Sequence, residues 1–261
     1  MTASASAVRA GFDERASGYA LWDELAAGDT RDRVLEHLDP VTDEVLLDLG
    51  AGPGAMTRAV GPFVRRVIAL DVSAQMLRAL GLESRRAGRL VPPRIQADAA
   101  SLPLSDASID LVACRHAWRL FPDPLTVARE IHRVTRPGAR IVICDLVGSG
   151  DPDVDAALEA FESELEPVSV RIATAEAWRE RFLEAGFRVE WLDSPIHDLQ
   201  AGRSLLDRCA RAGASSAAFE TARQHLLNGP EGLRRHLRVL VHGDDIQWHP
   251  PLGLLAARRL R

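Results

Sequence analysis

Cysteine is scarce in this chain, and its placement does not fit a metal site or a disulfide framework. The three cysteines are Cys114, Cys144 and Cys209, and none of them forms a CxxC or Cys/His ligand pattern. Cys114 and Cys144 each end an apolar run, where a thiol usually serves as a small core hydrophobe. We therefore expect reduced thiols in a cytoplasmic protein, and no bound metal.

Long hydrophobic segments and a concentrated positive charge are also missing. No stretch approaches the ~20 apolar residues that a membrane span requires, and the small, polar N-terminus lacks the apolar core of a signal peptide. The formal net charge is −5, and acidic residues are interleaved among most of the arginines, so no phosphate-tracking stripe is indicated. These absences argue against membrane and nucleic-acid partners and leave a small molecule as the expected partner. The oligomeric state stays open, with a homodimer as one option.

Apolar runs alternate with helical patterns through the first two thirds of the chain. The expected strands are 44–49, 67–70, 94–97, 109–114 and 140–146. Between them, Ser73 begins one amphipathic helix, and Asp123 with Pro124 begins another that Pro137 and Gly138 end. This repetition predicts an α/β fold, with a mainly parallel sheet covered by helices on both faces.

The last third of the chain has a different pattern. We expect helices over 151–166 and 174–185, a strand over 187–192, two helices within 199–228, and closing strands over 239–242, 246–248 and 252–257. No linker rich in Pro, Gly or Ser interrupts the chain, so we expect one domain over 1–261. Within it, 1–40 would form a helical cap, 41–147 a nucleoside-binding core, and 148–261 the substrate-side helices and closing strands.

The clearest functional signal is a glycine-rich turn between a strand and a helix. The strand 45–49 leads into Gly50-Ala51-Gly52-Pro53-Gly54, and a helix follows near Ala55. Gly50 and Gly52 have no Cβ, so a ligand can press against the backbone beside the free N–H groups of the helix start. A turn of this kind predicts a nucleoside site when acidic residues follow at the right spacing.

Two acidic residues follow at that spacing. Asp71 ends the next strand, about twenty residues on, where a carboxylate can accept hydrogen bonds from ribose hydroxyls. Asp98 ends the third strand, where a carboxylate could accept from an exocyclic amine such as that of adenine. Each could instead cap the helix that follows. The glycine-rich turn, Asp71 and Asp98 each follow one of three successive strands. Together they favour a nucleoside site beyond the carboxyl ends of those strands.

The charge near the turn indicates which nucleoside is bound. A dinucleotide fingerprint is G-x-G-x-x-G, whereas this chain has G-x-G-x-G with Asp48 two residues before the first glycine. A carboxylate at that place would repel a diphosphate but suits the ammonium and sulfonium groups of S-adenosylmethionine. The pattern therefore favours this methyl donor and disfavours an NAD-dependent oxidoreductase.

Taken together, these residues make the chain resemble the class I S-adenosylmethionine-dependent methyltransferases, in particular the group with quinone-biosynthesis and natural-product enzymes. The resemblance covers about residues 8–147. It rests on 12–19 (FDERASGY), 48–54 (DLGAGPG), 70–77 (LDVSAQML), 97–104 (ADAASLPL), and 121–124 (FPDP) through 136–140 (RPGAR). It implies a Rossmann-like, seven-stranded mixed sheet whose last strand is antiparallel, with helical insertions in the C-terminal third.

The resemblance also implies the cofactor-binding residues. They would be Tyr19, Asp48, Gly50, Ala51, Gly52, Asp71, Val72, Met76, Asp98, Ala99 and Arg115. Gly50 and Gly52 would lie against the methionine part, Asp71 would hold the ribose, and Val72 and Met76 would flank the adenine. The adenine amine would meet Asp98 and the Ala99 backbone. The backbone of Arg115 would meet the amino group, and Tyr19 would close over the carboxylate.

The chemistry of transfer is less constrained by the sequence. Methyl transfer is an in-line displacement, so a base is needed only where the nucleophile must lose a proton. The candidates for this base are His116, after the fourth strand, and Asp145, at the end of the fifth. The ordinary pKa of a histidine suits a base near neutral pH. Relatives often carry a His or aromatic pair before the FPDP stretch, where this chain has Arg119 and Leu120. An enzyme that binds the cofactor but catalyses a cyclisation or isomerisation therefore stays as the alternative. The acceptor would be a natural product or a quinone-like compound.

Overall fold

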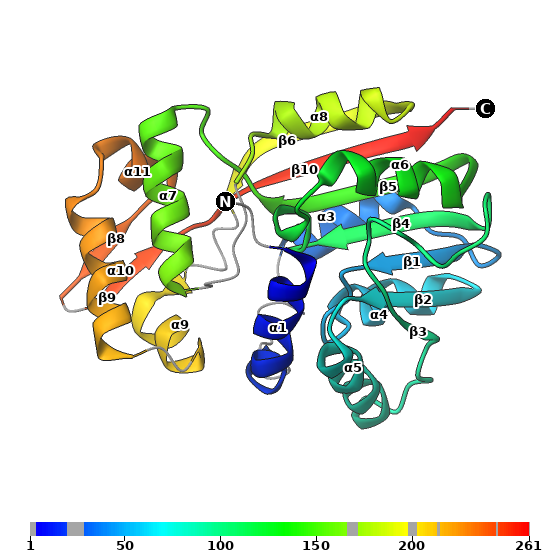
Figure 1. Ribbon diagram of the computed structural model, residues 1–261, viewed down its shortest axis with the longest axis horizontal. Helices are drawn as coiled ribbons and strands as arrows, with labels where there is room; N and C mark the ends of the chain where they lie inside the picture. Colours follow the sequence, from blue (N-terminus) through cyan, green and yellow to red (C-terminus); the bar gives the residue numbers. More distant parts are fainter. Residues whose placement is uncertain are drawn as a thin grey trace.

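The computed structural model describes residues 4–19, 29–165, 172–197, 203–212, 215–243 and 245–260. Its centre is a seven-stranded mixed sheet in the order β3-β2-β1-β4-β5-β10-β6 (Figure 1). The strands are β1 Val45–Leu49, β2 Arg66–Asp71, β3 Arg94–Gln96, β4 Ile109–Arg115, β5 Thr135–Leu146, β6 Phe187–His197 and β10 Pro251–Arg259. β1 to β5 are parallel, and β10 runs antiparallel between β5 and β6. The predicted fold class is confirmed.

Helices cover both faces of this sheet because its central strands are apolar on both sides. On one face Leu46 packs with Val34 and Leu38 of α3 (Asp29–Leu38), and α4 (Ala55–Val60) joins the same cluster. On the other face Leu47 packs in the cluster that holds α6 (Pro124–Val134) and α8 (Ala175–Glu184). α5 (Ala74–Arg86) packs against β2. Every residue of β1 is buried, as expected for an inner strand of a parallel sheet.

The C-terminal third forms a separate layer beyond the ends of β5 and β10, on the left in Figure 1. Its helices are α7 Pro152–Leu165, α9 Leu205–Ala212, α10 Ser216–Asn228 and α11 Glu231–His236. A small sheet of β7 Arg203–Ser204, β9 Asp245–Trp248 and β8 Leu240–His242 lies among them. α11 is a helix that the sequence pattern did not predict.

The strands expected at 239–242 and 246–248 do not close the main sheet. β8 is exposed at all three residues, and β9 alternates between buried and half-buried positions. The place between β5 and β6 requires a strand that is apolar on both faces, and β10 is buried over 251–257. Only the last of the three expected closing strands therefore enters the main sheet.

The start of β5 also differs from the expectation. Pro137 and Gly138 were expected to end a helix, but α6 ends at Val134 and both residues lie inside β5. The pairing of β4 with β5 is irregular between Ile109 and Leu111, and Gly138 has a φ of 87°. Proline and glycine within a strand are typical of such irregular pairing, which explains the difference.

Candidate nucleoside-binding site

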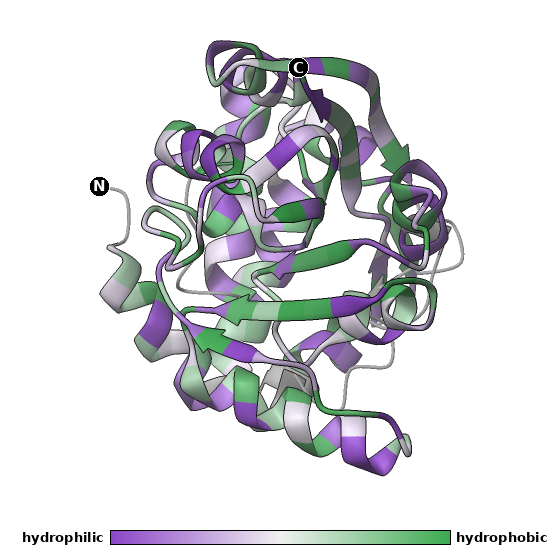
Figure 2. Cartoon of the chain, turned by 90° about the vertical axis from the view of Figure 1, so that its right-hand side faces the viewer, coloured by the Kyte–Doolittle hydropathy of each residue, from purple (hydrophilic) through white to green (hydrophobic). Residues whose placement is uncertain are grey.

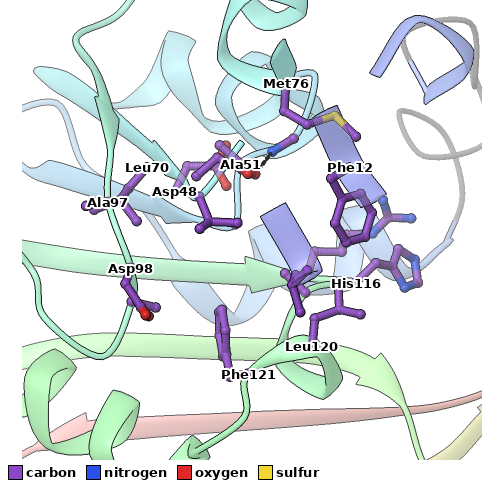
Figure 3. A pocket seen from close by; sticks show the side chains of 18 of the residues that line it. Phe12, Asp48, Ala51, Leu70, Met76, Ala97, Asp98, His116, Leu120 and Phe121 are labelled. Carbon is purple, nitrogen blue, oxygen red and sulfur yellow. Dashed lines mark hydrogen bonds between the residues drawn. The ribbon is translucent and has the colours of Figure 1, made fainter. Parts of the chain in front are cut away.

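A pocket of about 970 Å³ opens at the carboxyl ends of β1, β2, β3 and β4 (Figure 3). Its lining includes the sequence-predicted residues Asp48, Gly50, Ala51, Gly52, Asp71, Val72, Met76, Asp98, Ala99, Arg115 and His116. Tyr19 ends helix α1 (Ala5–Tyr19), and its side chain lies outside the described part of the chain. The structure thus brings together His116 and every predicted cofactor-binding residue whose side chain it describes.

The glycine-rich turn gives the pocket a bare backbone wall. Gly50 and Gly52 have φ values of 69° and 51°, in the left-handed region that favours glycine. A Cβ on Gly50 would lie 2.4 Å from the Cβ of Ala117, so the loop after β4 presses directly on this turn. A Cβ on Gly52 would meet no atom within 4 Å, because that position opens into the pocket. Gly50 therefore serves packing, while Gly52 leaves space for a ligand.

Asp48 is buried at the base of the turn. The backbone N–H and the hydroxyl of Thr57 donate to its Oδ2, at 2.8 and 2.6 Å, which ties β1 to α4. Burial raises the pKa of Asp48 to about 6, although the bonds from Thr57 oppose that shift, and the charge of Asp71 adds to it. A negative charge here is costly until a cation approaches the pocket.

Asp71 joins two walls of the pocket. The Gly52 N–H donates to its Oδ2 at 2.8 Å, and the Ser73 N–H donates to its Oδ1 at 2.9 Å. Burial raises the pKa of Asp71 to about 6, against the effect of these two bonds. The cap of α5 is Ser73, whose hydroxyl accepts from Met76 N–H. Asp71 is therefore not a helix cap.

Asp98 is exposed on the opposite side of the same pocket. Its Oδ1 accepts from the Ala100 N–H at 2.9 Å, and this bond holds the turn that follows β3. Ala99 beside it is buried. This bond is the kind of local backbone contact that a capping aspartate makes. Asp98 nevertheless also lines the pocket.

Helix α1, expected as part of a helical cap, forms one wall of the pocket through residues other than Tyr19. Its residues Val8 and Phe12 line the pocket and pack with Met76 and Leu120 in a small apolar cluster. Asp13, next along the helix, accepts from the Ser73 hydroxyl at 2.7 Å. The signal in the sequence was the spacing of apolar residues 8, 12 and 16, which are each about one turn apart and so lie on one face of a helix.

The loop after β4 carries His116 into the pocket. His116 has a φ of 59°, a left-handed conformation that is uncommon for histidine, and its N–H donates to the Cys144 carbonyl at 2.8 Å. Its Nδ1 lies 3.9 Å from Oδ1 of Asp145, and its side chain is 14% exposed. Beside it, the Arg115 guanidinium donates to the Thr30 hydroxyl at 3.1 Å. His116 therefore reaches both the pocket and a buried carboxylate.

Asp145, the second candidate base, is fully occupied by other groups. Arg119 donates to it through Nη1 at 2.8 Å and through its backbone N–H at 2.9 Å, and the Leu146 N–H adds a third bond at 2.7 Å. Its side chain is 0% exposed. A carboxylate held in this way orients its neighbours, and it does not line the pocket.

Most of the other tryptophans and histidines near the C-terminal third lie away from the pocket. Trp118 and Trp178 line a second cleft, which meets the pocket at Phe121 and Pro122. Trp248 is buried against Phe161, and Trp191 is exposed beside His37. His242 is exposed, and His249 is buried next to β10. None of these last four residues lines the pocket. No described helix is long and apolar enough to cross a membrane.

The geometry suits a nucleoside that carries positive charge. The open position at Gly52 gives access to the backbone, two buried carboxylates supply negative charge, and Val8, Phe12 and Met76 supply an apolar wall. A diphosphate would meet Asp48 and Asp71 with like charge. The residues present therefore fit S-adenosylmethionine better than a dinucleotide.

Comparison with known proteins agrees with this reading. Residues 47–143 match the family model described as a methyltransferase domain. A malonyl-(acyl-carrier protein) O-methyltransferase of Halorhodospira halophila is 33% identical over 260 residues, covering 96% of this chain and 83% of the relative. A demethylmenaquinone methyltransferase of Clavibacter sepedonicus is 32% identical over 190 residues, covering 71% and 76%.

The fold has a similar counterpart among solved structures. The YcgJ protein of Bacillus subtilis superposes with a TM-score of 0.78 at 21% identity, covering 89% of this chain and 98% of that one. The same family is indicated by the sequence identity over most of two relatives, by the order of the strands in the sheet and by the glycine-rich turn. The chain belongs to the class I S-adenosylmethionine-dependent methyltransferases.

Proposed function

We propose that this enzyme methylates a small-molecule acceptor that must lose a proton from a heteroatom, with His116 as the general base. One observation carries the proposal: the predicted cofactor residues and His116 line the same pocket. A nucleophile held there would be close to both the methyl donor and a base, and proximity can supply most of the rate enhancement of a displacement reaction.

Three carboxylates would hold the cofactor in this proposal. Asp48 would face the ammonium and sulfonium charges, Asp71 would accept from the ribose hydroxyls, and Asp98 would accept from the adenine amine. Val72 and Met76 would flank the adenine ring. Bound S-adenosylmethionine supplies an electrophilic methyl group on a cationic sulfur. The chain's own contribution is to bind and orient it and to exclude water with α1.

His116 fits the role of base by its surroundings. The buried Asp145 carboxylate stands 3.9 Å from its Nδ1, so it favours a ring orientation with Nε2 turned away from Asp145. Arg119 neutralises most of that carboxylate's charge through its 2.8 Å ion pair. The left-handed backbone of His116 is a local strain of the kind that clusters at functional sites.

The acceptor class follows from the need for a base. A phenol, hydroxyl or carboxyl group can lose its proton to an imidazole. The name of one relative specifies O-methylation of a malonyl-(acyl-carrier protein), and the name of another specifies a quinone, demethylmenaquinone. We propose a quinone-like or other natural-product acceptor. Membership of the methyltransferase family favours methyl transfer over the cyclisation or isomerisation alternative.

A transfer assay tests the proposed function. The enzyme is incubated with S-adenosylmethionine labelled in its methyl group and with separate pools of phenolic quinone precursors, carboxylic acids and malonyl thioesters. We expect label in one pool, in a product that mass spectrometry identifies as O-methylated. Cofactor binding with a cyclised or isomerised, unlabelled product would contradict methyl transfer and support the alternative.

Two glycine variants separate ligand space from backbone strain. Gly52→Ala and Gly88→Ala each place an alanine at positive φ, 51° and 64°, with no atom within 4 Å of the added Cβ. Each should lose a similar ~1–2 kcal/mol of unfolding free energy, measured with urea. Only Gly52→Ala should weaken S-adenosylmethionine binding, by at least roughly tenfold in calorimetry, because its Cβ enters the pocket. Equal affinities in the two variants would contradict a ligand against Gly52.

The affinity for the cofactor should depend on pH near 6. Asp48 and Asp71 both have a pKa raised to about 6, so both become protonated as the pH falls through that value. Protonation removes the negative charge that attracts the cation. The Kd for S-adenosylmethionine should therefore rise roughly tenfold or more between about pH 7.5 and pH 5. Asp71→Asn should flatten part of this dependence in calorimetry, and a Kd that does not change with pH would contradict the charge assignment.

His116→Asn tests the base without disturbing the loop, because asparagine tolerates a left-handed φ well. Once an acceptor is known, kcat should fall by about 10²–10⁴-fold, while the Kd for S-adenosylmethionine stays the same. His242→Asn, at an exposed histidine outside the pocket, is the matched control and should retain full activity. A His116→Asn enzyme with normal kcat would remove His116 from the mechanism.

A further inference from the structure

One surface outside the pocket carries arginines that have no acidic partner among the described residues. Segment 58–94 holds eight arginines and only two acidic residues, Asp71 in the pocket and Glu83. Six of these arginines are exposed and form what we call the arginine patch: Arg65, Arg66, Arg78, Arg85, Arg89 and Arg94. Among the described residues, no carboxylate lies within ion-pair distance of any of the six. Arg86 beside them is paired with Glu83 at 2.7 Å.

Several exposed arginines elsewhere have acidic partners, while Arg9, Arg234 and Arg238 have none among the described residues. The patch differs in holding six such arginines within one segment of the chain. Arg136 pairs with Asp110 at 2.5 Å, Arg140 with Glu44 at 2.7 Å, and Arg129 with Glu184 at 2.9 Å. The whole chain has a net charge of −5, so six unpaired cations on one side are a local reversal of its sign. Such a concentration favours association with an anionic surface.

Most of the patch lies toward the end of the sheet opposite the pocket, while Arg78 follows Met76 of the pocket wall by two residues on α5. Arg66 begins β2, Arg94 begins β3 and Arg85 is in the last turn of α5, whereas the pocket opens where the strands end. In Figure 1 this region is at the lower right, and Figure 2 turns it toward the viewer with hydrophilic stretches along α5, the lowest helix. A partner bound there would leave the nucleoside site accessible.

The shape and chemistry of the patch indicate the kind of partner. Arg78, Arg85 and Arg94 line one groove together with Val91 and Pro92. Exposed leucines stand beside it: Leu82 is 53% exposed, and Leu90 is 96% exposed. On α5, residues 78, 82 and 85 follow helical spacing, so one face presents Arg, Leu and Arg in sequence.

We infer that the arginine patch binds an acidic segment of a partner protein, a helix with carboxylates around a few apolar side chains. All cations of the chain are arginines, since the sequence contains no lysine, and a guanidinium matches a carboxylate with two parallel hydrogen bonds. The groove has no aromatic side chain on which nucleobases could stack.

A designed peptide tests this inference. The probe is a fluorescein-labelled helical peptide with Glu and Leu on one face and Ala on the other, and its partner probe has Gln in place of Glu. Fluorescence polarisation with the full chain should show binding of the Glu peptide at low salt, weakening as salt screens the charges, and little binding of the Gln peptide. No binding of the Glu peptide at low salt would overturn the inference.

Charge-reversal variants locate the binding site. The double variant Arg78→Glu, Arg85→Glu should weaken binding of the Glu peptide by roughly tenfold or more. The control Arg179→Glu, Arg235→Glu makes the same charge change at exposed positions of α8 and α11, and should weaken it by less than about twofold. Both variants should bind S-adenosylmethionine as the parent does, which shows that they are folded. If both double variants lost the same affinity for the Glu peptide, the loss would come from the change in overall charge. That result would overturn the inference.

Two further probes test the other anionic partners. Phosphatidylglycerol vesicles and single-stranded DNA are offered to the same variants at the same salt concentration. Binding of either probe that is tighter than peptide binding, and that Arg78→Glu, Arg85→Glu removes, would reassign the patch to a membrane or to nucleic acid. We expect the peptide to bind more tightly than both. Because none of the six arginines lines the pocket, the inference stands or fails independently of the proposed methyl transfer.

Discussion

A buried carboxylate with hydrogen bonds to two loops determines how the pocket is built. Asp71 accepts from Gly52 of the glycine-rich turn and from Ser73 at the start of α5, and the Ser73 hydroxyl donates to Asp13 of α1. This series of bonds links three walls that are far apart in the sequence. Burial also makes the charges of Asp71 and Asp48 costly in the absence of a cation, which is why the pKa of each is raised to about 6. The same arrangement shapes the pocket and selects a positively charged ligand.

The loop after β4 is fixed by packing rather than by the ligand. The Cα of Gly50 faces Ala117 so closely that any side chain at position 50 would collide with it. This contact and the Cys144 carbonyl hold the loop from two sides, and the strained conformation of His116 persists because its neighbours leave no alternative. Asp145 and Arg119 then fill the space below it with a buried ion pair. A side chain aimed by such a loop keeps its position when the acceptor changes.

The sequence predicted the core of this fold well, because its signals there are local. Buried strands such as β1 are continuous apolar runs, and the glycine turn with Asp71 at the next strand end has the spacing typical of nucleoside-binding α/β folds. The errors lie where tertiary context decides. β8 has strand propensity but is only three residues long, whereas the place between β5 and β6 is filled by the nine residues of β10, and Pro137 is inside an irregular strand instead of after a helix. For α1, the sequence predicted a helical cap with Tyr19 over the cofactor, and the contribution of Val8 was visible only as a spacing of apolar residues.

The arginine patch shows a second limit of reading charge along a chain. Over the whole chain, acidic residues are interleaved with most of the arginines, which suggests that the charges cancel, but segment 58–94 has eight arginines and only two acidic residues. In space the acids are engaged elsewhere: Glu44 is paired with Arg140, Asp110 with Arg136, and Asp71 is inside the pocket. Pairing across the fold therefore removes carboxylates from one side and leaves α5 and β3 with uncompensated cations. Their mutual repulsion destabilises the free protein slightly, and an acidic partner would relieve it.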